Sequence, residues 1–290
     1  MPKRDFRQGV SLSIVGLGGM VLVGASREQA SRLVADSVER GVNYFDVAPS
    51  YGDGEAEVAL GPALAPYRER VFLACKTLER SAAGARLELE RSLRRLRTDH
   101  FDLYQFHSVN KREDVERILA PDGAASAFLR AREEGLIRFL GFSSHSVPVS
   151  LNLLDRFSFD SILFPVNFVC YSRGSFGPQV VKKAKVRGIS CLAVKALAYA
   201  PWRKGEPRRY PNCWYQPIDD PVLALQALRF SLSEGVTAVL PPGDERLYRM
   251  AVELAITVTP FSAEEKRQLF ERAGSVRPIM TAKKTPTTEL

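Results

Sequence analysis

Four ionisable residues follow three apolar segments of the sequence, and their side chains suit proton transfer to a reacting oxygen. Asp46 ends the segment NYFD, Tyr51 lies five residues later, Lys76 follows VFLAC, and His107 follows DLYQF. Hydride addition to a carbonyl carbon leaves negative charge on the oxygen, which then needs a proton and positive potential nearby. A phenol, whose ordinary pKa is about 10, gives up its proton near neutrality only when a cation stabilises its anion.

The four side chains have complementary tasks in such a reaction. Tyr51 is the predicted proton donor, and Lys76 is the cation that stabilises its anion. Asp46 pairs with Lys76 in this hypothesis and keeps the ammonium charged despite burial, while His107 hydrogen-bonds the substrate oxygen and orients it. A single strand-end His or loop Tyr is usually structural, so the hypothesis depends on the four meeting at one place.

The order of elements along the chain provides such a meeting place. Short strands are expected at 12–17, 44–47, 71–75, 103–106, 139–142, 161–164, 189–194 and 236–240. Helices are expected at 27–40, 55–64, 85–96, 114–133, 148–157, 178–186, 222–232 and 245–255, with one more at 263–273. This alternation predicts a single α/β domain over residues 1–290, a (β/α)₈ TIM barrel of parallel strands with a short N-terminal lead-in, an extra C-terminal helix and a flexible tail at 275–290. In such a barrel, the carboxyl ends of the strands converge on one mouth, where Asp46, Tyr51, Lys76 and His107 are expected.

Two other kinds of dinucleotide-binding protein fit the sequence less well than a barrel does. The segment GLGGM at 16–20 suggests a Rossmann turn, but the third glycine of G-x-G-x-x-G would fall on Val21. A short-chain dehydrogenase needs Tyr-x-x-x-Lys, and no Tyr in this chain has a Lys four positions later.

Six motifs in matching order give the chain a resemblance to a known family. They are GLGGM, GVNYFDVAPSYGDGEAEVALG, ACKT, LERSLRRLRTDHFDLYQFH, GFSSHS and GVTAVLPPG, and they extend over about residues 6–255. The chain resembles the aldo-keto reductases, which are barrels that bind NADP(H), less often NAD(H), in extended form across the strand ends. The resemblance implies that Asp46, Tyr51, Lys76 and His107 are the catalytic residues.

The resemblance also implies cofactor contacts, with some departures from the family pattern. The implied contacts are Gly18, Gly19, Ser143, Ser144, Asn167, Lys195, Gly243 and Arg246. Ser144 stands where relatives often have Asn, and Leu163 replaces a Gln that holds the nicotinamide carboxamide. Val194 replaces a stacking aromatic, whose role could pass to Phe168, Tyr199 or Trp202. Arg246 is the candidate contact for a 2′-phosphate, so NADP(H) is favoured over NAD(H), although Asp244 or Glu245 could instead accept a ribose hydroxyl.

The longest irregular connection is expected at 201–221, after the seventh strand. Long loops at the mouth are often lids or binding loops, and Trp202, Trp214 and Tyr215 are the predicted substrate contacts. The basic residues Arg203, Lys204, Arg208 and Arg209 either fold over a pyrophosphate or form a solvated surface loop.

Composition limits the remaining possibilities. The net charge of +8 suits an anionic ligand. Four cysteines without a CxxC pair have no metal-site spacing and indicate reduced thiols in the cytoplasm.

The arginine-rich segment 86–97 lacks interleaved aromatics and predicts an exposed helix face, not a nucleic-acid site. The apolar run 10–25 after Lys3, Arg4 and Arg7 reads as a strand and turn or, alternatively, as a signal peptide, and is too short and Gly-rich for a membrane span.

The predicted function is therefore NAD(P)H-dependent reduction of a small carbonyl compound by a monomer or small homo-oligomer, without metal, nucleic-acid or membrane partners. The alternative is a regulatory subunit that binds the nucleotide with little or no turnover.

Overall fold

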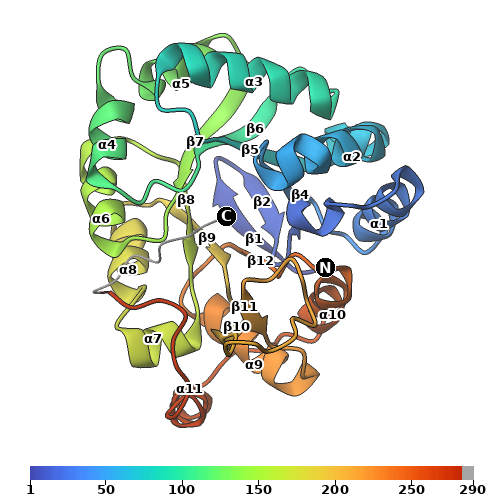
Figure 1. Cartoon of the computed structure of the whole chain (residues 1–290), viewed down its shortest axis with the longest axis vertical. Coiled ribbons are helices and arrows are strands. Elements are labelled where there is room, and N and C mark those ends of the chain that lie inside the picture. Colours follow the sequence, from blue (N-terminus) through green and yellow to red (C-terminus); the bar gives the residue numbers. More distant parts are fainter. Residues whose placement is uncertain (283–290) are drawn as a thin grey trace.

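Parallel strands form a closed barrel in the order that they have along the chain (Figure 1). The computed structural model describes residues 1–282. Its eight-stranded sheet consists of β3 (Leu17–Gly18), β4 (Tyr44–Asp46), β5 (Phe72–Thr77), β6 (Phe101–Phe106), β7 (Ile137–Ser143), β8 (Ser161–Pro165), β9 (Ser190–Val194) and β12 (Ala238–Leu240). Two hydrogen bonds close the ring, because Gly16 N donates to Val239 O at 3.0 Å and Val239 N donates to Ile14 O at 2.9 Å. The predicted (β/α)₈ barrel is confirmed.

Helices surround the barrel and bury one apolar face each. They are α1 (Arg27–Glu39), α2 (Glu55–Leu64), α3 (Ala82–Leu96), α4 (Arg112–Leu119), α5 (Ala124–Glu133), α6 (Val147–Arg156), α7 (Phe168–Gly174), α8 (Pro178–Val186), α9 (Pro221–Ser233), α10 (Glu245–Ala255) and the additional α11 (Ala263–Arg272). In α3, Leu89, Leu93 and Leu96 are buried against the sheet, whereas Leu87 is exposed.

The N-terminal lead-in is a β-hairpin that covers one end of the barrel. The predicted strand at 12–17 is wrong as a single element, because β1 (Lys3–Arg7) pairs antiparallel with β2 (Val10–Ser13) before the barrel begins. The hairpin buries Phe6 and Leu12 against the barrel interior, which includes Phe72 and Phe139. The continuous apolar run predicted one strand, but burial of these apolar side chains favours the hairpin.

The predicted helix at 114–133 is also wrong as a single element. It is divided into α4 and α5, with Pro121 and Gly123 between them. Proline removes a helical N–H donor and disfavours helical geometry in the residue before it, so the chain turns here.

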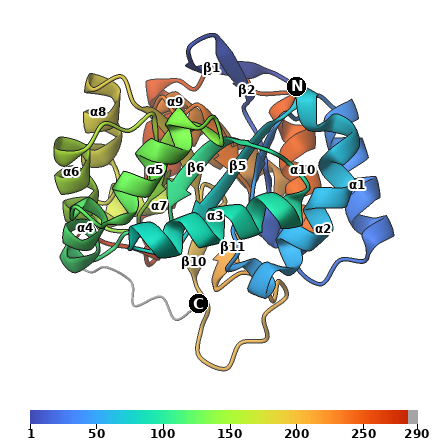
Figure 2. The same ribbon diagram turned by 90° about the horizontal axis from the view of Figure 1, so that it is seen from above.

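A second hairpin stands at the opposite end of the barrel from the first (Figure 2). It consists of β10 (Ala198–Pro201) and β11 (Tyr215–Pro217), which pair antiparallel. The segment expected to be irregular at 201–221 therefore has a strand at its start and another near its end, and the loop between them projects outward at this end of the barrel.

The chain after α11 packs back onto the barrel helices. Met280 is buried, and Ala282 N donates a hydrogen bond to Gly174 O at 2.9 Å. The part of the expected tail up to residue 282 is thus attached to α7, and residues 283–290 lie outside the described residues. In the described part of the chain, no helix has the length and apolarity needed to cross a membrane.

Candidate active site

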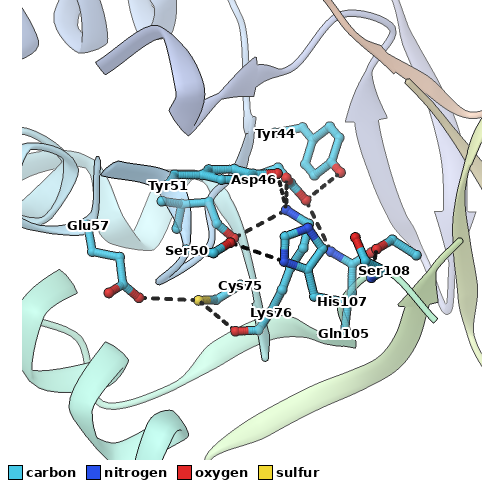
Figure 3. A network of polar contacts seen from close by, with 12 residues as sticks. Tyr44, Asp46, Ser50, Tyr51, Glu57, Cys75, Lys76, Gln105, His107 and Ser108 are labelled. Atoms are coloured by element: carbon cyan, nitrogen blue, oxygen red, sulfur yellow. Dashed lines mark hydrogen bonds and ion pairs between the residues drawn. The ribbon is translucent and has the colours of Figure 1, made fainter. Parts of the chain in front are cut away.

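Neighbouring strands deliver the four predicted residues to the mouth of the barrel. Asp46 is the last residue of β4, Lys76 lies near the end of β5, and His107 directly follows β6. Tyr51 begins a 3₁₀ turn, η2 (Tyr51–Gly54), that follows β4. Because β4, β5 and β6 are adjacent and parallel, all four side chains lie together (Figure 3).

Lys76 forms the centre of this group. Its Nζ is paired with Asp46 Oδ1, and it also donates hydrogen bonds to Tyr51 Oη at 3.3 Å and to Val47 O at 3.3 Å. Lys76 and Asp46 are both buried. Burial by itself lowers the pKa of Lys76, but the Asp46 carboxylate and the Tyr51 hydroxyl outweigh it and raise the pKa above its ordinary value. The ammonium therefore stays charged inside the protein.

Tyr51 is held in its protonated form. Burial raises the pKa of its phenol above the ordinary value, while the neighbouring Lys76 ammonium lowers it and limits the rise. Since Oη accepts the hydrogen bond from Lys76, its own hydrogen is available to another acceptor. The Tyr51 ring also meets the His107 ring edge-on, with 5.8 Å between centroids.

Two further residues fix Asp46, and neither was predicted. Tyr44 Oη donates to Asp46 Oδ2 at 3.2 Å, and Gln105 Nε2 donates to the same oxygen at 3.1 Å. Strand alternation and register were the available signals, because Gln105 on β6 lies opposite Lys76 on β5. With Lys76 on Oδ1 and two donors on Oδ2, the buried carboxylate is compensated on both oxygens.

His107 is positioned as a neutral imidazole. Ser50 Oγ lies 3.3 Å from His107 Nδ1, and Arg80 Nη2 donates to the His107 carbonyl oxygen at 2.7 Å. Burial and the nearby Lys76 ammonium hold the pKa of His107 well below its ordinary value. The ring can therefore donate one hydrogen bond without carrying a charge.

Cys75, next to Lys76, points in the opposite direction. It is packed in the core between sheet and helices, with its Sγ 3.6 Å from Glu57 Oε1. Burial raises the pKa of the thiol well above its usual range, so it is a core residue and not a nucleophile, as strand alternation predicts.

The group borders a cavity of about 160 Å³ at the strand ends. Of the predicted residues, those that line it are Gly18, Asp46, Tyr51, His107, Ser143, Lys195, Trp214, Tyr215 and Gly243. It is also lined by residues that sequence reasoning did not select, which are Met20, Ser108, His145, Asn212, Leu240, Pro241 and Pro242, and by Leu163 and Val194. Most of these lie at strand ends, and only their convergence in three dimensions marks them as site residues.

Four of the remaining predicted contact residues form hydrogen bonds or ion pairs within the protein itself. Ser144 Oγ accepts from Ser146 N at 3.0 Å within its turn. Asn167 Oδ1 accepts from Cys170 N at 2.9 Å as the cap of α7, and its Nδ2 donates to Lys195 O and Ala198 O. Trp202 Nε1 donates to Cys213 O at 2.8 Å. Arg246 forms an ion pair with Asp244 at 3.0 Å, and its guanidinium lies 4.8 Å from the Tyr210 ring centre.

Lys76, which is paired with Asp46, does not line the cavity either, and the last such residue is Gly19. It is needed for close packing, because a Cβ there would lie 2.8 Å from Val47 Cγ2. Five predicted contacts thus lie outside the lining of the cavity, namely Ser144, Asn167, Trp202, Arg246 and Gly19.

Sequence and structure comparisons place this geometry among known proteins. The Aldo/keto reductase family profile matches residues 14–209. The chain belongs to the aldo/keto reductase family. The uncharacterized oxidoreductase YqkF of Bacillus subtilis is 32% identical over 47% of this chain and 46% of its own length. Methylglyoxal reductase YeaE of Escherichia coli is 38% identical over 36% of this chain and 38% of its own.

These alignments cover less than half of each curated relative. The solved structure of aldo-keto reductase AKR11C1 from Bacillus halodurans, in its holo form, matches 98% of this chain and all of its own, with a TM-score of 0.75 and 25% identity. The barrel of this chain is thus the aldo/keto reductase barrel.

The cavity fits the nicotinamide end of the cofactor that the aldo/keto reductase family implies. Leu163, Val194 and Leu240 form an apolar wall suited to a flat ring. Space is open where a Cβ of Gly18 would stand, so a ring can approach the backbone there. Ser143, His145 and Lys195 supply polar groups around the same space. The cavity is smaller than the roughly 300–1,000 Å³ typical of ligand pockets, so the rest of a dinucleotide must lie outside it.

Proposed function

We propose that the protein reduces an aldehyde or ketone to an alcohol with NADPH or NADH. The observation that supports this most directly is the contact between Tyr51 Oη and Lys76 Nζ, 3.3 Å apart at the edge of the cavity. When bound, the reduced nicotinamide supplies the hydride that adds to the carbonyl carbon.

The residues of the chain handle the proton in this proposal. The negative charge that develops on the carbonyl oxygen takes the proton of Tyr51 Oη, which forms the alcohol and leaves a phenolate. The Lys76 ammonium stabilises that phenolate, and Asp46 keeps the ammonium in place. Solvent then returns a proton to Tyr51 before the next turnover.

His107 orients the carbonyl in the same scheme. Its Nδ1 lies against Ser50 Oγ, so Nε2 is the nitrogen left to meet the substrate oxygen. A neutral imidazole donor positions the oxygen without competing with Tyr51 as the acid.

For the cofactor, NADP(H) is the proposed preference. Ser143 and Gly18 would hold the nicotinamide end, Gly243 would lie toward the adenosine end, and Arg246 at the start of α10 would bind the 2′-phosphate. Arg246 is largely exposed but paired with Asp244, so the phosphate must replace this carboxylate as its partner. The four cysteines are free thiols, which supports a cytoplasmic location.

The test is a titration of the protein with NADPH and NADH followed by fluorescence, and then an assay of dinucleotide oxidation with small aldehydes and ketones. We expect saturable binding, tighter for NADPH, and oxidation that depends on the carbonyl compound. Binding of neither dinucleotide contradicts the proposal. Tight binding without turnover on any carbonyl compound contradicts the enzymatic part and supports a regulatory role.

A further inference from the structure

The cavity beside Tyr51 and His107 contains a second lysine without an opposite charge. Lys195 follows β9 and lines this cavity. Within residues 1–282, none of the ion pairs or hydrogen bonds involves its Nζ, whereas Lys76 is paired with Asp46. The three N–H donors of this ammonium group therefore have no acceptor within the described residues.

The backbone holds Lys195 in an unfavourable conformation for a residue other than glycine. Its φ is +63°, in the left-handed region. Asn167 Nδ2 donates to Lys195 O at 3.0 Å and Ala198 N donates to the same oxygen at 2.9 Å, so the turn is fixed by a buried side chain. Backbone strain of this kind persists only where the surrounding structure enforces it, and it is concentrated at functional sites.

Aromatic rings flank the ammonium group without neutralising it. Lys195 Nζ lies 5.4 Å from the Trp214 ring centre and 5.0 Å from that of Tyr215. Burial lowers the pKa of Lys195 to about 8, so the amine is still mostly protonated at neutral pH. Ring faces attract the cation but cannot accept its hydrogen bonds as a carboxylate does.

The other charged and titratable groups of the cavity leave Lys195 as its available cation. Asp46 is the one carboxylate among the lining residues, and Lys76, Tyr44 and Gln105 already occupy its oxygens. Burial lowers the pKa of His145 to about 3, with a smaller contribution from Lys195, so that imidazole is neutral. The cavity therefore offers donors and positive charge, which suits a ligand rich in acceptors.

We propose that Lys195 binds a carboxylate of the substrate, so that the cavity selects carbonyl compounds that also carry an acid group. This inference rests on the proposed function and specifies its substrate class. Lys195, Tyr51 and His107 border one cavity of about 160 Å³, so a carbonyl compound bound at Tyr51 and His107 shares that cavity with the Lys195 side chain. The diphosphate of a dinucleotide has similar chemistry, and the experiment separates the two sources.

Binding without turnover is measured first. Trp214 is one of two tryptophans and lies beside Lys195 Nζ, so its fluorescence reports on the site. The probes are oxamate, a carboxylate that cannot be reduced here, and the neutral oxamide. The variants are Lys195→Met and, as a matched control on the exposed surface of α8, Lys182→Met. We expect oxamate binding to weaken about 10- to 100-fold in Lys195→Met, as for loss of a charge-assisted hydrogen bond, and to be unchanged in Lys182→Met.

Turnover then links the site to the substrate. We expect Lys195→Met to raise KM for pyruvate by a similar factor, and by more than it raises KM for methyl pyruvate or Kd for NADPH. An equal effect on the acid and its ester, or unchanged oxamate binding, overturns the inference. So does a loss confined to NADPH binding, which assigns Lys195 to the diphosphate. If oxamate binding depends on Lys195 but no carbonyl compound is reduced, the proposed function fails and the anion site stands.

Discussion

Gln105 Nε2 lies 3.1 Å from Asp46 Oδ2, on the carboxylate oxygen that Lys76 does not occupy. Tyr44 Oη donates to the same oxygen. Side chains from β4, β5 and β6 therefore hold Asp46 in place. Because Asp46 is paired with Lys76, and Lys76 contacts Tyr51, these side chains also position Lys76 and Tyr51. In the proposed mechanism, the position of Tyr51 thus depends on side chains that do not touch the substrate.

Replacing Gln105 tests this dependence. Gln105→Leu keeps the side-chain volume but removes a donor to a buried charge, and we expect it to lower the free energy of unfolding by about 1.5–3 kcal/mol. Turnover should fall as well, because Asp46 and Lys76 lose part of their alignment, while Kd for NADPH should not change. Denaturant unfolding and steady-state kinetics measure both, with the exposed Gln268→Leu on α11 as the control. Unaltered stability and turnover in Gln105→Leu argue that the hydrogen bond has no positioning role.

The buried pair Asp46–Lys76 predicts a strongly non-additive pair of substitutions. Lys76→Met leaves the Asp46 carboxylate uncompensated and should destabilise the fold by about 3–5 kcal/mol. In the double variant Asp46→Asn, Lys76→Met, no buried charge remains, so the loss should be smaller than the sum of the two single losses. A double-mutant cycle by denaturant unfolding measures the coupling, and simple additivity shows that the pair does not form in solution.

The neutral, half-buried His145 predicts a loss of stability in acid. Its pKa is lowered from an ordinary value of 6.5 to about 3, so between these values the unfolded chain takes up a proton that the folded chain does not. The free energy of unfolding should therefore fall as the pH falls from about 6.5, by up to about 1.4 kcal/mol per pH unit for this group. His107, whose pKa is also lowered, should add a loss in the same direction.

His145→Gln should make the free energy of unfolding depend less steeply on pH, by an amount that corresponds to about one proton taken up on unfolding. Denaturant unfolding from pH 7 to pH 4 measures this slope. His100, which is partly exposed and lies beside Asp99, offers a control in His100→Gln. An unchanged slope in His145→Gln would mean that this imidazole titrates normally in the folded protein.

Much of this site follows from strand order, and the rest depends on packing between distant segments. Asp46, Lys76 and His107 were predictable because parallel strands of a barrel bring their carboxyl ends together. The divided helix at Pro121 was also open to prediction, since proline interrupts helical hydrogen bonding.

Other features leave no local signal in the sequence. The β1–β2 hairpin forms because Phe6 and Leu12 are buried against the barrel interior at one end of the barrel. The left-handed turn at Lys195 is held by Asn167 from another strand-end loop, 28 positions away in the chain. Such features can be seen only in the tertiary structure, because the types and spacing of these residues in the sequence do not indicate which residues they contact.

The proton-donor role of Tyr51 is tested most directly by Tyr51→Phe. This change removes the phenolic proton and little of the cavity wall, so we expect turnover to fall about 10²- to 10⁴-fold with Kd for NADPH unchanged. Single-turnover oxidation of bound NADPH by a carbonyl substrate, measured beside a fluorescence titration of the same variant, gives both numbers. Turnover of Tyr51→Phe close to that of the parent protein would show that Tyr51 is not the proton donor.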